Sequence, residues 1–339
     1  MKKVIRIVLI VFLSAATIII QSQSITNITA AYNGENIIIT YDIEGVSTGT
    51  VLKIDLFVSK DGGAAFDGPL KKVSGNVGNE VRTFRNNQIS WRVSEEYPEF
   101  ISDKVVFEIR GTPDNKIEIQ FEIIKGGSYT MGTRDGDDNT KPTHRVTLND
   151  FYIGKYEITQ EQWLKIMGTN PSLHRNCPTC PVENVTYTDI LKFIEKLNRQ
   201  NTGFYYRLPT EAEWEFAASS GKTKDRELFS GNNSAEPVAW YVANSAGSTH
   251  PVGEKAPNDF GIYDLSGNVS EWCSDFYSPL YYKLSPEKNP PGPESGGSRV
   301  VRGGSWNQAA NSCRTTNRQY EVQTFKSPNI GLRLVKIIN

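Results

Sequence analysis

Few residues in this sequence belong to the types that most often bind transition metals or transfer protons. Among 339 residues there are three histidines, four cysteines and three methionines. The histidines are His144, His174 and His250, and they lie far apart without a shared spacing. This disfavours a metal centre built on a histidine cluster. The sequence also has no Gly-rich phosphate-binding motif and no supported Ser-His-Asp arrangement.

Net charge is almost absent as well. The 37 basic and 38 acidic side chains leave a formal charge of −1 at pH 7, which gives no general attraction to nucleic acid or to an anionic membrane. We therefore expect no nucleic-acid partner. Aromatic residues and glycine are plentiful, with 15 Tyr, 15 Phe, 6 Trp and 28 Gly. This composition favours strands and ordered loops over a helical bundle.

Long apolar runs are limited to the start of the chain. Basic residues at positions 2, 3 and 6 precede an apolar run at 8–20, and Ser22 and Ser24 are small residues suited to cleavage after Ser24. This pattern predicts a signal peptide at 1–24, and a retained amphiphilic anchor is the alternative. We expect an exported mature chain without a transmembrane segment, located in the periplasm, at the cell surface or outside the cell, where cysteines can pair.

Residues 25–112 have the pattern of a small β domain. Short runs rich in β-branched and aromatic residues alternate with turn signals such as Asn33-Gly34, which predicts strands near 37–41, 51–58, 88–93 and 105–109. Trp91 is the expected core anchor. This spacing predicts an immunoglobulin-like sandwich that serves as a spacer or a binding module. The turn-rich segment 113–117 is the expected linker.

Residues 118–339 predict a second domain with three helices and many loops. Capping-box patterns start helices after Thr159 and Thr210, and apolar residues at helical spacing predict a helix over 187–199. Strands are expected at 117–124, 144–148, 151–153 and 331–335. After Gly221 we expect mostly loops.

One short stretch, at 301–318, has the residues of a possible reactive site. Two adjacent glycines at 303 and 304 allow close backbone approach, and Cys313 is followed by Arg314 and Arg318. Guanidinium groups near a thiol could stabilise a thiolate. The alternative interpretation is a glycine bend beside a core strand, with Cys313 in a disulfide.

Seven sequence blocks in a fixed order carry a resemblance to a known family. They read GGSYTMG at 126–132, YEIT at 156–159, PVENV at 181–185, RLPTEAEWE at 207–215, GNVSEW at 267–272, RGGSW at 302–306 and GLR at 331–333. Together they resemble the formylglycine-generating-enzyme (sulfatase-modifying-factor) family over about 118–339. The resemblance implies a compact, loop-rich variant of the C-type-lectin fold. The overall expectation is an α+β protein, with an immunoglobulin-like β-sandwich before this domain.

The resemblance implies a copper site with two cysteine ligands, and this chain lacks at least one of them. Enzymes of the family oxidise a sulfatase cysteine to formylglycine with oxygen and a copper(I) ion held by two cysteines. Counted from the glycine turn without a gap, the second position is Cys313 but the first is Gln308; with a deletion after the turn, neither is matched. Ser305 matches the serine of the turn. An amide is a poor ligand for copper(I), so we expect no copper and no formylglycine formation.

The resemblance also implies a calcium site. The matching ligands would be the carboxylates of Asp264 and Glu271 and the backbone carbonyls of Gly267 and Val269, with Glu157 as a tentative addition. Oxygen-only ligation of this kind suits calcium. The alternative is that Asp264 and Glu271 are turn and cap residues without an ion.

The remaining cysteines leave several possibilities open. Cys177 and Cys180 form a CxxC that could be a zinc half-site, a redox pair or a structural disulfide. The disulfide is favoured because the motif lies in a loop before a proline, in an exported chain. Cys273 and Cys313 would then be left as a tentative second pair, which would make Cys313 unavailable for chemistry.

Two functions from different classes follow. The first is a non-catalytic family member that acts as a scaffold binding an unidentified protein or glycan. The second is a metal-dependent oxidase acting on a protein cysteine or a small thiol through Cys313. Gln308 separates them, because the known oxidase chemistry requires cysteine at that position.

Overall fold

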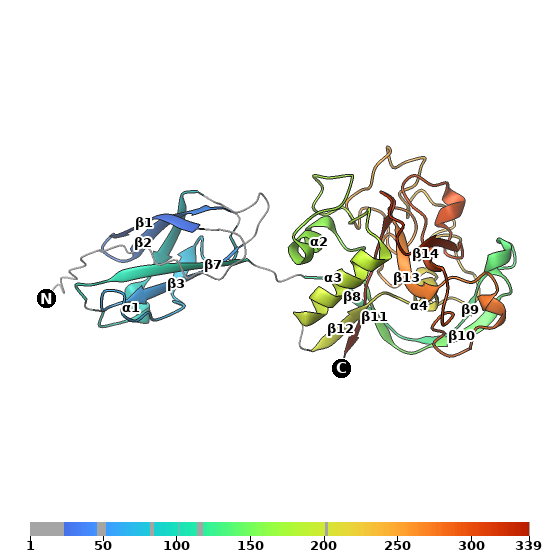
Figure 1. Ribbon diagram of the computed structural model, residues 1–339, viewed down its shortest axis with the longest axis horizontal. Helices are drawn as coiled ribbons and strands as arrows, with labels where there is room; N and C mark the ends of the chain where they lie inside the picture. The colour runs from blue at the N-terminus through green and yellow to red at the C-terminus, as the bar shows by residue number, and fades with distance from the viewer. Residues whose placement is uncertain are drawn as a thin grey trace. The chain divides into compact units, whose positions relative to one another are not determined.

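The chain divides into two compact units, Met1–Lys116 and Ile117–Asn339, which are described separately. A computed structural model describes residues 24–45, 52–81, 85–100, 102–113, 118–200 and 203–338 (Figure 1). Apart from Ser24, the predicted signal peptide lies outside the described residues. The predicted linker does so too, except for Pro113. Within the described ranges, no helix is long and apolar enough to cross a membrane.

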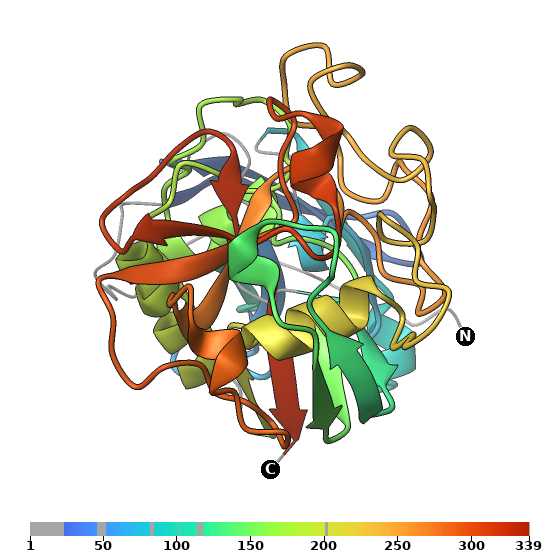
Figure 2. The same cartoon turned by 90° about the vertical axis from the view of Figure 1, so that its right-hand side faces the viewer.

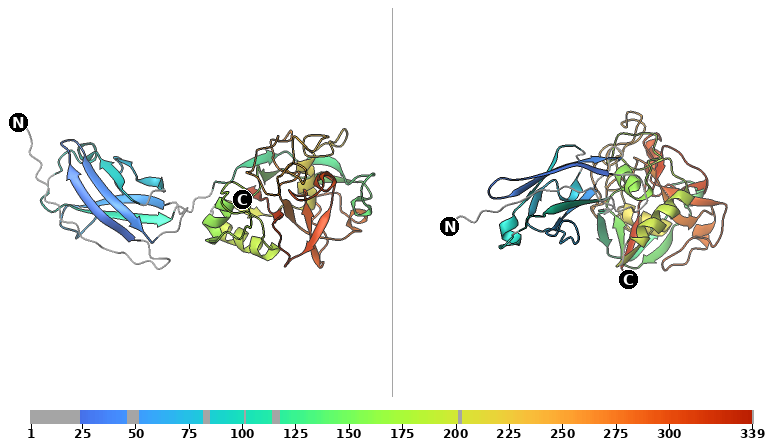
Figure 3. Two further views of the ribbon diagram at one scale, coloured as in Figure 1. Left: turned by 90° about the horizontal axis from the view of Figure 1, so that it is seen from above. Right: turned by 60° about the vertical axis from the view of Figure 1, so that its left-hand side comes forward.

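The first unit consists of two antiparallel sheets around one core. One sheet has the order β1-β2-β6-β4 and the other β5-β3-β7 (Figure 3). The strands are β1 (Ser24–Tyr32), β2 (Ile37–Glu44), β3 (Leu52–Ser59), β4 (Val73–Gly75), β5 (Gly78–Val81), β6 (Asn87–Trp91) and β7 (Val106–Pro113), with the short helix α1 (Val93–Glu96) after β6. Alternate residues of β2 and β3 point into the same apolar cluster. That the unit is of immunoglobulin type stays a prediction.

Trp91 has the core position expected from the sequence. Its side chain is fully buried, and the rings of Tyr97, Phe100 and Phe107 meet it edge-on at 5.4–6.0 Å between centroids. Its indole N–H donates to Glu96, so the polar atom of the ring is satisfied and the ring can be buried without an unpaired donor.

The second unit is a mixed α+β structure with two four-stranded sheets and one hairpin. One sheet has the order β12-β17-β11-β8, the other β15-β14-β13-β16, and β9 pairs with β10. The strands are β8 (Phe121–Ile124), β9 (Gly127–Met131), β10 (His144–Leu148), β11 (Phe151–Gly154), β12 (Phe204–Arg207), β13 (Ser270–Phe276), β14 (Ser298–Arg302), β15 (Gln319–Val322), β16 (Ile330–Gly331) and β17 (Val335–Ile338). Three short 3-10 helices lie in its loops, η1 (Asp138–Thr140), η2 (Tyr281–Lys283) and η3 (Ala310–Cys313).

The three predicted helices are confirmed, and local sequence explains where each begins. Helices α2 (Gln160–Met167) and α4 (Glu211–Ala218) begin with the predicted capping boxes at Thr159 and Thr210, and α3 (Tyr187–Arg199) has the predicted bounds and a third capping box. In each box a threonine hydroxyl accepts from the third helical N–H. Helix α4 packs against β9, β13 and β14, and Figure 2 shows it, in yellow, beside the green hairpin.

Most of the chain after Gly221 is irregular, as expected, but the strands β13, β14 and β15 within it were not predicted. Strand β13 is buried on both faces over Ser270–Cys273, and its buried side chains include Glu271 and Asp275. Alternation of apolar and polar residues is the signal by which strands are predicted. A strand that buries carboxylates, as β13 does with Glu271 and Asp275, does not show that alternation.

Candidate functional site

The glycine turn brings the two segments of the predicted reactive site together. Gly303 and Gly304 have positive φ values of 97° and 67°, and a Cβ on Gly304 would lie 2.7 Å from the backbone of Ser312. Only glycine permits this approach. The turn therefore holds Ser305 close to the backbone that leads into Cys313, as the sequence indicated.

Ser305 and Gln308 take part in a network of amides rather than in a nucleophilic site. The Ser305 hydroxyl is buried, donates to Asn307 and accepts from the Asn329 amide. The Gln308 side chain exchanges hydrogen bonds with Gln319 at 3.2 and 3.4 Å. Among the described residues, the hydrogen-bond partners of both side chains are amides, not basic groups.

Cys313 lies in an apolar environment. Its side chain is fully buried and packs with Phe229, Ala235, Val238 and Ala239. Burial raises the pKa of the thiol to about 12, although the backbone N–H groups of Ser305 and Gly267 partly oppose this. The thiol is therefore protonated at neutral pH, and the thiolate required of a nucleophile or a copper ligand is disfavoured.

The arginines after Cys313 do not stabilise a thiolate. The guanidinium of Arg318 is fully buried and bonds to Glu211 at 2.6 and 2.7 Å. Arg314 does not contribute to the pKa shift of the thiol. The hypothesis of a guanidinium-activated cysteine is therefore wrong for Arg318 and receives no support from Arg314.

One of the two predicted disulfides is present. Cys177 and Cys180 are bonded, which confirms the structural interpretation of the CxxC motif. The tentative Cys273–Cys313 bridge is wrong, since both cysteines are free and buried. The reason is that they belong to different apolar clusters: Cys273 packs with the residues around Trp214, and Cys313 packs with those around Phe229.

A thiol count on the folded protein tests this arrangement. We expect no alkylation of the folded, non-reduced chain, and two alkylated cysteines, Cys273 and Cys313, after denaturation without reductant. The reason is that both thiols are fully buried. Mass spectrometry of the labelled peptides is the measurement. Labelling of Cys313 in the folded state would contradict the burial, and two unreactive cysteines after denaturation would restore the second bridge.

The calcium residues are brought together, and Glu271 also pairs with Arg333. Its two oxygens accept Nε and Nη2 of Arg333 at 2.8–3.1 Å and the indole N–H of Trp214 at 2.8 Å. A carboxylate offers about four lone-pair positions, and three N–H donors share those of Glu271.

The other carboxylates of the predicted calcium set are buried nearby. Glu157 accepts from the Asn268 amide and from the backbone N–H of Val269, and Asp264 accepts from the N–H of Gly253. Burial, and then the charges of Asp264 and Glu271, raise the pKa of Glu157 well above its usual range. Burial also raises the pKa of Asp264 to about 6. No group of three metal-ligating acids, histidines or cysteines is preformed within the described ranges.

Gly267 in the same loop is required for packing. A Cβ there would lie 2.2 Å from the backbone oxygen of Trp240, so the glycine is explained without an ion. Calcium binding through Asp264, Gly267 and Val269, with Glu157, stays a prediction. Ligation by Glu271 stays a prediction as well, and this residue is in addition the ion-pair partner of Arg333.

Replacement of Glu271 tests whether its main role is the pair with Arg333. Glu271→Gln removes the hydrogen-bonded counter-charge of the buried Arg333, and we expect a loss of roughly 3–5 kcal/mol in unfolding free energy, the same in calcium as in chelator. Glu195→Gln, which breaks an exposed pair with Arg199 on α3, is the control and should cost about 0.3–0.5 kcal/mol. Denaturant unfolding measures both. A loss seen only with calcium present would show that Glu271 acts mainly as a calcium ligand.

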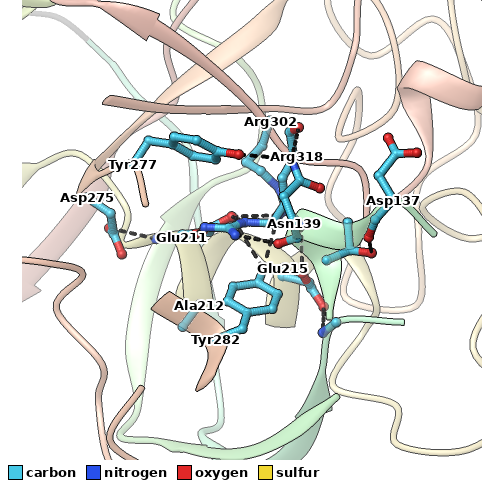
Figure 4. Close-up of polar contacts among 12 residues, drawn as sticks. Asp137, Asn139, Glu211, Ala212, Glu215, Asp275, Tyr277, Tyr282, Arg302 and Arg318 are labelled. Carbon is cyan, nitrogen blue, oxygen red and sulfur yellow. Dashed lines mark hydrogen bonds and ion pairs between the residues drawn. The ribbon is translucent and has the colours of Figure 1, made fainter. Parts of the chain in front are cut away.

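Sequence reasoning missed a buried ion network next to the glycine turn. Glu211 and Glu215, one turn apart on α4, bind the guanidinium of Arg302 at 2.8 and 2.7 Å (Figure 4). Glu211 also binds Arg318, and Glu215 binds Arg226 at 3.1 Å. The motifs RLPTEAEWE and RGGSW contain three of these five residues, but neither motif by itself shows that they pair.

The arginines keep both glutamates charged in the interior. Burial alone would raise the pKa of Glu211, but the nearby Arg318 and Arg302 outweigh it, and the pKa is lowered. The same holds for Glu215, with Arg302 and Arg226 as the opposing charges. The network is therefore an ionic structural element and offers no proton-transfer group at neutral pH.

Asp275 on β13 is the titrating group beside this network. It is buried and accepts from the first N–H of α4, at Glu211. Burial, followed by the charge of Glu211, raises its pKa to about 7. The folded state therefore binds a proton that the unfolded state releases between about pH 4 and 7, so Asp275 lowers stability as pH rises through that range.

Asp275→Asn should remove this pH dependence. Relative to the wild type, the variant should gain stability between pH 4 and 7, by at most about 1.4 kcal/mol per pH unit, and the difference should be constant above the folded pKa. Asp225→Asn, at an exposed aspartate, controls for the loss of one carboxylate. Thermal unfolding from pH 4 to 8 is the measurement. Parallel curves for wild type and variant would show that Asp275 does not titrate in this range.

Comparisons with known proteins agree with this architecture. The family model described as "Sulfatase-modifying factor enzyme 1-like domain" matches residues 112–338. The chain is similar to the chaperone protein LppX of Paenibacillus barcinonensis, with 31% identity over 263 residues, covering 63% of this chain and 88% of LppX. It is also similar to the formylglycine-generating enzyme of Streptomyces coelicolor, with 35% identity over 280 residues, 62% of this chain and 87% of the enzyme.

Other relatives show that the domain occurs in different contexts. The chain is 30% identical over 243 residues to the serine/threonine-protein kinase Pkn1 of Chlamydia trachomatis, but spans only 38% of that kinase. Among solved structures, Treponema denticola variable protein 1 matches with a TM-score of 0.60 and 30% identity, over 65% of this chain and 95% of that one. PvdO from Pseudomonas aeruginosa matches with a TM-score of 0.57 and 27% identity, over 64% of this chain and 94% of PvdO.

The second unit is thus an α+β domain of the formylglycine-generating-enzyme type with several ion pairs buried in its interior. The chain belongs to the sulfatase-modifying factor family, as the seven sequence blocks indicated. That the fold is a variant of the C-type-lectin fold stays a prediction.

Proposed function

We propose that this chain is an exported member of the family that does not form formylglycine and instead binds another protein. The observation that carries the proposal is the pair of positions matching the copper ligands. At one, Gln308 is engaged with Gln319; at the other, the Cys313 thiol is buried with a pKa of about 12. Copper(I) requires soft thiolate ligands, and this pair supplies none at neutral pH.

Two further observations support the rest of the proposal. The Cys177–Cys180 disulfide suits an oxidising compartment, as does the predicted signal peptide. A protein ligand is supported by the relative LppX, which is named a chaperone and is matched over most of its length. The alternative, an oxidase acting through Cys313, has no support from the surroundings of that thiol.

A side-by-side assay tests the loss of activity. The chain and the Streptomyces coelicolor enzyme are incubated with copper(I), oxygen and one cysteine-containing sulfatase peptide, and peptide mass is followed. We expect the Streptomyces enzyme to convert the peptide cysteine and this chain not to convert it. We also expect no tight one-to-one copper(I) binding by the reduced chain, because Cys313 is an isolated and buried thiol. Conversion by the chain, or tight copper binding that Cys313→Ser abolishes, would establish the oxidase alternative.

The same samples test protein binding by light scattering during refolding of a denatured exported enzyme. The chain should lower the scattering in proportion to its concentration, and the Streptomyces enzyme serves as the fold-matched control. Equal scattering with and without the chain would count against a general chaperone-like activity.

A further inference from the structure

A polar cavity of about 500 Å³ lies beside the ion network, and no function described above uses it. Its walls come from three separate segments, the loop at 132–140, residues 226–228 and the segment at 311–317. The volume falls within the usual range for sites that bind a small ligand or a few residues of a peptide.

Arg314 gives this cavity an unpaired positive charge. Its Nε is buried and has no hydrogen-bond partner, and its guanidinium forms no ion pair with any residue in the described ranges. The other arginine in the wall, Arg226, is engaged by Glu215 and by the carbonyl of Thr130. Arg314 is therefore the arginine of this wall that lacks an anionic partner among the described residues, and a ligand would reach it through the outer nitrogens of the guanidinium.

The facing loop supplies unpaired negative charge. Asp135 and Asp137 line the cavity, and neither carboxylate has an ion-pair partner among the residues that the structure describes. Other acids nearby are paired: Asp138 with Lys141, and Glu227, also in the wall, with Lys222. In Figure 4 no dashed line reaches the Asp137 carboxylate. The cavity therefore presents an unpaired cation on one segment and unpaired anions on another.

The rest of the wall narrows the ligand class. Its polar side chains are hydroxyls and amides from threonine, serine and asparagine, and none of the lining residues is aromatic. Nucleobases are usually held by stacking on aromatic side chains, which this wall does not offer. Hydroxyls and amides suit the N–H and C=O groups of a peptide.

We propose that this cavity binds the carboxyl terminus of a polypeptide that ends in lysine or arginine. Arg314 receives the terminal carboxylate in a charge-assisted hydrogen bond, Asp135 and Asp137 receive the basic side chain, and the hydroxyls and amides bind the backbone. The inference rests on the proposed function, since it gives the protein-binding scaffold a specific peptide ligand.

Isothermal titration calorimetry with short peptides tests this at low ionic strength. Gly-Gly-Lys with a free carboxylate should bind, whereas its C-terminal amide and Gly-Gly-Glu should each bind at least about tenfold more weakly, since each loses one charged contact. Arg314→Ala should weaken binding by a similar factor. Arg134→Ala removes the same charge from an exposed residue outside the cavity wall and should leave the affinity unchanged.

A second matched pair tests the acidic loop. Asp137→Asn should reduce the preference for Gly-Gly-Lys over Gly-Gly-Gly several-fold, and Asp138→Asn, next to it but outside the wall, should not. Thermal unfolding confirms that all four variants are folded, which we expect because neither Arg314 nor Asp137 has a side-chain partner to lose.

Three results would overturn the inference. These are the absence of binding heat for all peptides at millimolar concentration, equal affinity for the acid and the amide, or an equal effect of Arg134→Ala and Arg314→Ala. Binding of N-acetylglucosamine that depends on Arg314, without peptide binding, would overturn it in favour of a glycan. These failures are distinguishable from failure of the proposed function, which is measured by formylglycine formation and by scattering.

Discussion

The second unit depends on the need to neutralise charges that its fold places out of contact with water. Glu211, Glu215, Arg302, Arg318 and Arg333 are each at most 4% exposed. Removing an ion from water costs several kcal/mol unless an oppositely charged partner is in place. The helix α4, the strand β14 and the segment after Cys313 can therefore be buried only together. Glu211 and Glu215 of the RLPTEAEWE block and Arg302 of the RGGSW block are the charged residues that neutralise one another.

The same constraint explains why a loop-rich unit can have a single structure. Apolar packing tolerates exchange between side chains of similar volume, whereas a buried guanidinium accepts only the few geometries in which its donors find acceptors. Arg302 meets both glutamates of α4 and the carbonyl of Thr315. Arg333 meets Glu271 and the carbonyls of Gly154 and Tyr263. Arg302 thereby links β14 to α4 and to the loop at Thr315. Arg333 links β11 and β13 to the loop at Tyr263.

The residues around the glycine turn make structural contacts. The glycine turn and Ser305 occupy the positions that the resemblance gave them, yet the surrounding residues form amide and apolar contacts. Cys313 behaves as a small buried hydrophobic residue, and Gln308 pairs with another amide. Gly304 lies so close to the backbone of Ser312 that no other residue fits, whether or not a reaction takes place there. A family motif of this kind is thus compatible with a binding role.

The sequence by itself determined the features that depend on neighbouring residues. The three helices and their capping boxes, the disulfide between Cys177 and Cys180, the core position of Trp91 and the membership of the family all followed from local patterns. Strands β13 and β14 did not, because buried polar residues such as Glu271 and Arg302 conceal the alternation.

Only the tertiary structure decided which charges meet. Glu211 and Arg318 are 107 residues apart, and Glu271 and Arg333 are 62 apart. Nothing in a local pattern distinguishes a glutamate that binds a metal ion from one that binds an arginine. The partner depends on which segments the tertiary fold places side by side. The fold places Arg314 in the wall of the cavity without a counter-charge among the described residues.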